Sequence, residues 1–301
     1  ATKGWIPLND DEVTFDHGNP PTQKAIFAYG TTTTAYLSAS NLVNSSGVVA
    51  TDVTGVGTGR GNLAAAGYGG DKAIFGYGTT GSYSSLTNLV NNSGVVAADV
   101  TGVGTARRKL AAAGYGGDKA IFGYGDAGSD SSLTNLVSNS GVVATDTTGV
   151  GTVRDSLAAA SYGGDKAIFG YGDTSSGVSL TNLVSNSGVV AADVTGVGTA
   201  RSSLAAAGYG TDKAIFAYGY TSGVVSMSNL VSSSGVVATD VTGVGTARYG
   251  LAAATYGTDK AIFGYGYNGS AAVSMTNLVN SSGVVATDVT GVGTAKYSLA
   301  A

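Results

Sequence analysis

The sequence predicts an all-β fold built from one repeated unit, and three observations carry that prediction. The string Lys-Ala-Ile-Phe occurs six times, first at Lys24 and last at Lys260, at intervals of 47 or 48 residues. Each copy holds four short apolar segments rich in Val, Ile, Phe and Tyr, and clusters of Gly, Ser and Asn separate them. No apolar segment reaches the roughly 10–12 residues that a helix would need.

The second copy shows the expected elements in order. We expect a first strand at 63–66, a second at 72–75, a third at 86–90 and a fourth at 95–100. Four strands in a unit of this length match one blade of a β-propeller. The first strands are Ala-rich because innermost strands crowd toward the axis, where only small side chains fit.

The phase of the repeat predicts how the array closes. It opens on a second strand at Lys24 and finishes on a first strand at 299–301. An open stack would leave incomplete units at both ends, whereas a ring lets the C-terminal strand complete the first blade and protects the sheet edges. We therefore expect six four-stranded blades over residues 24–301.

The repeated pattern resembles a known family. An Arg, a small-residue strand, an apolar strand ending in glycines and two further strands resemble the kelch type of propeller, with Gly76-Tyr77-Gly78 in place of its double glycine. Leu89-Val90 and Val95-Val96 stand where that family has Tyr and Trp. Blades built from Lys-Ala-Ile-Phe-Gly-Tyr-Gly and Val-Thr-Gly-Val-Gly-Thr-Ala-Arg are more similar to propellers encoded by marine bacteriophages. This resemblance implies a virion-surface or tail-associated protein.

The composition excludes several classes of function. The chain has no Cys, a single His and 11% charged residues, so we expect no disulfide, no metal centre, no cofactor and no catalytic residues. A net charge of −4 argues against nucleic acid as a partner. No apolar run is long enough to span a membrane, and the first residues lack a signal-peptide pattern. We expect a protein that is not an enzyme, although a hydrolase remains a third possibility.

An Asp and a basic residue recur in every copy, for example Asp99 and Arg107. One interpretation is a ring of carboxylates for a metal or a ring of cations for an anion. The other, which we favour, is hydrogen bonding in turns and Asp–Arg pairing between blades, because an isolated ring of like charges would repel itself.

The copies differ mainly on one face, which we call the variable face. It comprises the loops between second and third strands and the residue pair after each repeated basic residue. The loops are 31–38, 79–85, 126–132, 173–179, 220–226 and 267–274. Variable loops on a rigid scaffold often carry recognition, although drift at tolerant loop tips would also explain the variation.

The variable face is chemically uneven. Blades five and six carry four Tyr suited to stacking on sugars or packing on protein, while blades three and four carry Asp residues, among them Asp155. The candidate binding residues are Tyr36, Tyr83, Arg108, Lys109, Asp126, Asp130, Asp173, Tyr220, Tyr249, Tyr267 and Tyr297.

Residues 1–23 precede the repeats and differ from them. This arm holds the only Trp and the only His and has a net charge of −3. We expect Trp5, Ile6 and Phe15 to attach the propeller to other virion or surface-assembly proteins; a strap across the propeller's own face is the alternative. The predicted function is adhesion to host-surface glycans or proteins from a virion surface or an extracellular assembly. A structural or decoration protein that contacts other virion subunits is the other prediction.

Overall fold

The computed structural model describes residues 25–301, and this part of the chain forms strands, bridges and turns without any helix. It contains six antiparallel sheets, one in each repeat, and we number the repeats as units 1–6. By unit, the strands are β1 (Ala25–Ala28) and β2 (Ser40–Val43); β3 (Ala64–Tyr68), β4 (Lys72–Gly76) and β5 (Thr87–Val90); β6 (Ala111–Tyr115), β7 (Lys119–Asp126) and β8 (Asp130–Val137); β9 (Ala158–Tyr162), β10 (Lys166–Gly170) and β11 (Thr181–Val184); β12 (Ala205–Tyr209), β13 (Lys213–Tyr220) and β14 (Val224–Val231); β15 (Ala252–Tyr256), β16 (Lys260–Gly264) and β17 (Thr276–Val279).

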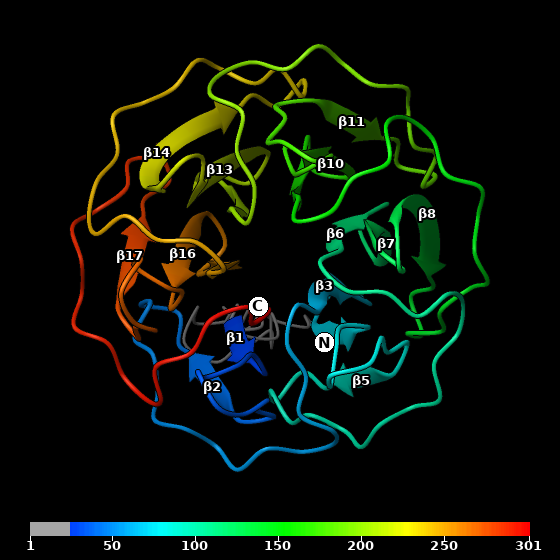
Figure 1. Cartoon of the computed structure of the whole chain (residues 1–301), viewed down its shortest axis with the longest axis horizontal. Helices are drawn as coiled ribbons and strands as arrows, with labels where there is room; N and C mark the ends of the chain where they lie inside the picture. Colours follow the sequence, from blue (N-terminus) through cyan, green and yellow to red (C-terminus); the bar gives the residue numbers. More distant parts are fainter. Residues whose placement is uncertain (1–24) are drawn as a thin grey trace, which may run out of the picture.

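The sheets lie side by side around a ring in a propeller-like arrangement (Figure 1). The Ala-rich strands β3, β6, β9, β12 and β15 contact one another in sequence, as expected for innermost strands. Unit 1 has only two named strands, and the end of the chain lies beside them. Ala300 pairs with Ala28 and Tyr297 pairs with Thr31, both antiparallel.

The expected fourth strand is an irregular segment joined to the third strand by isolated bridges. In unit 2, Val96 pairs with Val90 and Val100 pairs with Thr87. The segment from Val96 to Val100 is therefore one residue longer than the stretch from Thr87 to Val90 that it faces. The extra residue interrupts the ladder of backbone hydrogen bonds between them. The Asn88 side chain fills the gap, because its Nδ2 donates to the Ala97 carbonyl (3.0 Å).

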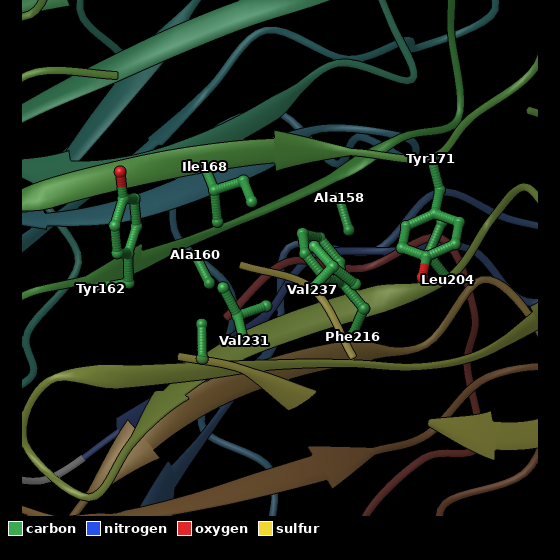
Figure 2. Close-up of a cluster of buried hydrophobic side chains, with 10 residues drawn as sticks. Ala158, Ala160, Tyr162, Ile168, Tyr171, Leu204, Phe216, Val231 and Val237 are labelled. Carbon is green, nitrogen blue, oxygen red and sulfur yellow. The ribbon is translucent and has the colours of Figure 1, made fainter. Parts of the chain in front are cut away.

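The hydrophobic core lies between neighbouring sheets. Between units 4 and 5, one cluster extends from Tyr162 at one end to Tyr171 at the other, with Phe216 in it (Figure 2). Phe216 packs closely on Gly170, where a Cβ would lie 2.7 Å from its Cζ, and the equivalent position in the other units is Gly or Ala. The core therefore depends on pairing a large side chain in one unit with a small residue in the neighbouring unit.

Each Lys-Ala-Ile-Phe segment is followed two residues later by a buried Tyr in a conformation rare for a bulky residue. Tyr124 has a φ of 63°, and the pairing of β7 with β8 skips it as a bulge between Gly123 and Gly125. Its Oη donates to the Val150 carbonyl (3.0 Å), and burial raises its pKa to about 12. These contacts hold the strained residue, and the bulge redirects the strand toward the variable face.

Candidate binding face

The recurrent Arg residues belong to the scaffold. Arg154 is fully buried and donates from Nε to the Tyr171 carbonyl (2.8 Å), from Nη1 to the Thr152 carbonyl (3.0 Å) and from Nη2 to Asn182 Oδ1 (2.6 Å). Its guanidinium also lies 4.3 Å from the centre of the Tyr124 ring in the preceding unit. A buried cation with these donors satisfied is not available to a soluble anion.

The recurrent Asp residues complete the same network. Asp193 lies 3.8 Å from Arg154 Nη1 and accepts hydrogen bonds from Thr152 Oγ1 (2.6 Å) and Asn182 Nδ2 (2.9 Å). Burial alone would raise the pKa of Asp193, but the hydrogen bonds from Thr152 and Asn182 outweigh burial and lower it. Within residues 25–301, no group of three or more His, Cys, Asp or Glu could hold a metal ion. Five of the six recurrent Asp residues thus lie within 4.0 Å of a recurrent Arg at the junctions, as the favoured interpretation predicted, whereas Asp52 and Lys296 form no ion pair with each other within that distance.

The two sets of variable segments meet on one face. In each unit, the first residue of the variable pair forms an antiparallel bridge with the loop after the second strand. The six bridges are Tyr297–Thr31, Gly61–Thr79, Arg108–Asp126, Asp155–Asp173, Ser202–Tyr220 and Tyr249–Tyr267. Side chains that are far apart in sequence are thereby fixed beside one another.

The second residues of the variable pairs form a closed ring of backbone hydrogen bonds. Each N–H donates to the carbonyl of its counterpart in the preceding unit at 2.6–2.9 Å, and Asn62 donates to Ser298 to close the ring. The other members are Lys109, Ser156, Ser203 and Gly250. All six have φ between 52° and 61°, a left-handed conformation that is strained for the five that are not glycine. The ring links all units below the variable side chains.

Four tyrosines form a continuous arc on this face. Ring centres are 5.6 Å apart for Tyr220 and Tyr249, 5.6 Å for Tyr249 and Tyr267, and 5.4 Å for Tyr267 and Tyr297. Tyr220 is 42% exposed and the other three are half-buried. Each ring supports its neighbour at an angle, so the arc presents a preorganised aromatic surface.

An acidic hollow, lined by Asp126, Asp130, Asp155 and Asp173, lies next to the tyrosine arc. Its volume is about 640 Å³, and Ser202, the bridge partner of Tyr220, also lines it. The side chains of Asp155 and Asp173 project from a bridged pair, where like charges repel. Burial, together with Asp155, Asp126 and Asp173, raises the pKa of Asp130.

Two cations partly neutralise the hollow. Arg108 Nε donates to Asp126 Oδ2 and Lys109 Nζ donates to Asp155 Oδ2, each at 2.9 Å. Burial alone would raise the pKa of Asp126, but hydrogen bonds from the Gly128 N–H and Arg108 lower it. Asp126 and Asp155 are therefore ion-paired, while Asp130 and Asp173 have no ion-pair partner within 4.0 Å among the described residues.

Of the remaining candidate residues, Tyr83 borders the acidic hollow and Tyr36 lies in another unit. Tyr83 Oη donates to Asp126 at 3.3 Å, and the Arg108 guanidinium lies 5.3 Å from the centre of its ring. Tyr36 is 41% exposed in unit 1 and bridges to Thr31. The attachment residues Trp5, Ile6 and Phe15 lie outside the described residues.

Sequence reasoning missed one recurrent residue and the backbone ring. Asn182 links the third strand, the outer segment and the buried Arg154, because it accepts from the guanidinium and donates to Ala191 and Asp193. Its recurrence in every copy was the available signal. The ring of backbone hydrogen bonds left no such signal, because its members include Asn, Lys, Ser and Gly.

Comparison with known proteins assigns this chain to no family. No protein-family model matches this chain, and no curated protein matches it. None of the described residues lies in a helix that is long and apolar enough to cross a membrane.

Proposed function

We propose that this chain is a non-catalytic, six-bladed propeller of kelch-like pattern whose four-stranded blades present the variable face for adhesion. In this proposal, the first blade is completed by the C-terminal strand, and the protein is displayed on a virion surface or another extracellular assembly. The ligand is a host-surface glycan or protein, and no cofactor takes part. Trp5, Ile6 and the rest of the arm at 1–23 attach the propeller to other proteins of the particle.

The observation that carries the proposal is the tyrosine arc beside the acidic hollow. Aromatic rings stack on the apolar faces of sugars, and carboxylates accept hydrogen bonds from hydroxyl groups. Tyr220 belongs to the arc and is bridged to Ser202 in the hollow, so one extended ligand could contact both. The closed backbone ring favours recognition by limiting the ordering that binding would require.

The ion pairs favour binding over hydrolysis. A glycosidase needs two carboxyl groups in separate roles, an acid and a nucleophile or base. Asp126 and Asp155 are engaged by Arg108 and Lys109, which lowers their availability as nucleophiles. Burial raises the pKa of Asp130, and the charged groups that act on it are Asp155, Asp126, Asp173 and Lys109.

The test is binding to a panel of immobilised bacterial surface glycans, with tyrosines of the arc replaced. We expect the double variant Tyr249→Ala/Tyr267→Ala to lose at least about tenfold in affinity, because each large aromatic contact contributes on the order of 1–2 kcal/mol. Tyr36→Ala is the control, since Tyr36 is exposed and lies outside both the arc and the hollow. Equal binding by the double variant, the control and the parent would contradict the proposal, as would glycan cleavage by the parent.

A second candidate function has its own observation. Six valines, one from each unit, are 60–65% exposed although they recur in every copy. They are Val48, Val95, Val142, Val189, Val236 and Val284. Their recurrence in every unit is the observation that favours a structural or decoration protein that packs on other virion subunits.

Association in solution separates the two candidates. For the structural alternative, Val95→Ser/Val189→Ser/Val284→Ser should abolish incorporation into particles or self-association, measured by sedimentation, with glycan binding unchanged. If particle incorporation persists in this variant but is lost on deletion of 1–20, the arm provides attachment and the valines do not.

A further inference from the structure

The loop after β16 contains the only Asn-Gly pair in the sequence, Asn268-Gly269, which directly follows Tyr267 of the tyrosine arc. The Asn268 N–H donates to the Ala271 carbonyl (3.1 Å). The Asn268 side chain accepts at Oδ1 from the N–H groups of Ser270 (3.0 Å) and Ala271 (2.9 Å). Because both donors come after Asn268 in the chain, its side-chain amide is folded over the peptide that joins it to Gly269.

Gly269 offers an accessible backbone nitrogen to this amide. It is exposed and has a φ of 93°, and a Cβ there would lie no closer than 3.7 Å to another residue. Among the described residues, neither the Gly269 N–H nor Asn268 Nδ2 takes part in a hydrogen bond. The nitrogen that could attack and the nitrogen that could leave are therefore both free, while the two N–H groups on Oδ1 polarise the Cγ–Oδ1 bond.

We propose that Asn268 is a site of self-modification, at which the Gly269 nitrogen attacks Asn268 Cγ. The bond from the Gly269 nitrogen to Cγ forms, the Cγ–Nδ2 bond breaks, and Nδ2 leaves as ammonia with the proton from the Gly269 N–H. Water then opens the resulting five-membered ring. Opening at Cγ gives an aspartate, and opening at the backbone carbonyl gives an isoaspartate. No oxidation or reduction occurs, and the proposal does not rest on the adhesion function.

An asparagine of the same unit provides an internal comparison. Asn280 is exposed, and its Oδ1 accepts from the N–H groups of Ser282 (2.9 Å) and Val284 (3.0 Å). Its side chain is therefore folded over the following backbone in the same way as that of Asn268. The next residue is Ser281, whose Cβ crowds the approach of its nitrogen to Cγ. Asparagine is thermolabile in general, but the glycine restricts rapid modification to Asn268.

The modification alters the support of the tyrosine arc. Tyr267 Oη donates to the Ser270 carbonyl (3.0 Å), so the ring is anchored to the turn that Asn268 holds. An aspartate keeps this turn, because a carboxylate oxygen accepts the same N–H groups. An isoaspartate adds one carbon to the main chain before Gly269 and displaces Ser270 from Tyr267. Both products place a new negative charge beside the arc.

Incubation of the full chain at neutral and mildly alkaline pH tests the chemistry, with peptide mapping by mass spectrometry as the readout. We expect Asn268 to be converted at least about tenfold faster than Asn280, which corresponds to a barrier lower by about 1.4 kcal/mol. The rate should rise with pH, because the Gly269 nitrogen must lose its proton to attack. Equal rates at the two asparagines would overturn the proposal. So would an unmodified Asn268 in the folded chain when a free peptide of residues 264–272 is converted.

The chain itself supplies a matched variant, Asn268→Thr. In unit 1, Thr32 has the same role, because its N–H donates to the Ala35 carbonyl (2.9 Å) and its Oγ1 accepts from the Ala35 N–H (3.1 Å). Thr has no side-chain amide, so we expect this variant to fold, to stay unmodified at 268 and to keep its tyrosine near-ultraviolet circular dichroism on incubation. The parent should lose that signal in proportion to the isoaspartate formed. An equal loss in both proteins would show that the modification does not act on the arc.

Discussion

The four junctions with a fully hydrogen-bonded Arg and the junction that closes the ring differ in one buried residue. Arg248 donates to Tyr265, Thr246 and Asn277. At the closure, Lys296 donates from its Nζ to Asn41 Oδ1 (2.9 Å) and, at 3.4 Å, to the Ala39 carbonyl. A planar guanidinium can link three elements, whereas an ammonium is a point charge on a flexible chain. The closure therefore has the same architecture but fewer hydrogen bonds.

Burial affects the two kinds of junction differently. It lowers the pKa of Lys296 to about 8, and the charge of Asp52 offsets part of that effect. It also lowers the pKa of Arg248, but Arg stays protonated in proteins. Among the junctions of the described residues, only the closure therefore contains a buried cation with a pKa of about 8.

Removal of the closing segment should have the largest effect on stability. Deletion of 296–301 removes Lys296, the Tyr297–Thr31 bridge, the buried Leu299 and the Ala300–Ala28 bridge. We expect a loss of at least about 5 kcal/mol in unfolding free energy, comparable with the whole stability of many domains. Denaturant unfolding measures it, and deletion of Ala301 alone is the control with a small expected effect. Parental stability in the longer deletion would show that the ring does not depend on this segment.

The next largest effect concerns an Arg junction. Arg154→Ala leaves Asn182 and the Tyr171 carbonyl without their buried donor, and we expect a loss of about 3–5 kcal/mol in unfolding free energy. Arg108→Ala is the control, because Arg108 is 38% exposed in its side chain and its ion pair should contribute less than about 1 kcal/mol. Similar losses in the two variants would mean that burial of the Arg is not what matters.

Acid should weaken all junctions together. The repeated Asp residues have lowered pKa values because hydrogen bonds from Thr and Asn outweigh the effect of burial. Their stabilisation is complete above the unfolded pKa of about 3.9 and is lost as pH falls through the lower folded value. Thermal midpoints should stay level from pH 7 to 5 and fall below about pH 4. The variant Asp146→Asn, measured alongside, should show a shallower acid dependence than the parent.

The smallest expected effect sharpens the comparison at the closure. Lys296→Arg offers the donors found at the other junctions, and we expect a gain of about 1 kcal/mol in unfolding free energy. In the parent, the unfolded state binds more protons between pH 8 and the usual Lys value near 10.5, so stability rises with pH across that window. The Arg variant should lose that rise. Lys119→Arg, at an exposed Lys, should change neither quantity.

Much of the fold could be predicted from the sequence because it repeats locally. The Lys-Ala-Ile-Phe segments form β4, β7, β10, β13 and β16, as expected. The Ala-rich segments form the strands that pair with them on the side nearer the centre of the ring, also as expected. The fourth segment was predicted as a strand because Val-rich runs favour β structure. The structure instead joins it by single bridges, because the Asn88 side chain takes the place of backbone donors.

The sequence predicted which residues lie on the binding face but not how these residues contact one another. Variation among the copies located Tyr249 and Tyr267 on one face, and the structure places their ring centres 5.6 Å apart. The pairing of Lys109 with Asp155, 46 residues away, had no local signal. Such contacts depend on how far one unit is rotated from the next, which no short segment encodes.

The repeat, the strand order, the position of the variable residues and the phase that brings Ala300 beside Ala28 follow from the sequence alone. Periodicity carries this information, because local propensity and hydrophobic pattern recur in every copy. The backbone ring through Asn62 and Ser298 and the ion pair of Lys109 with Asp155 depend on the tertiary structure. Both arise where different units meet, because there the packing of neighbouring sheets sets which groups come within hydrogen-bonding distance.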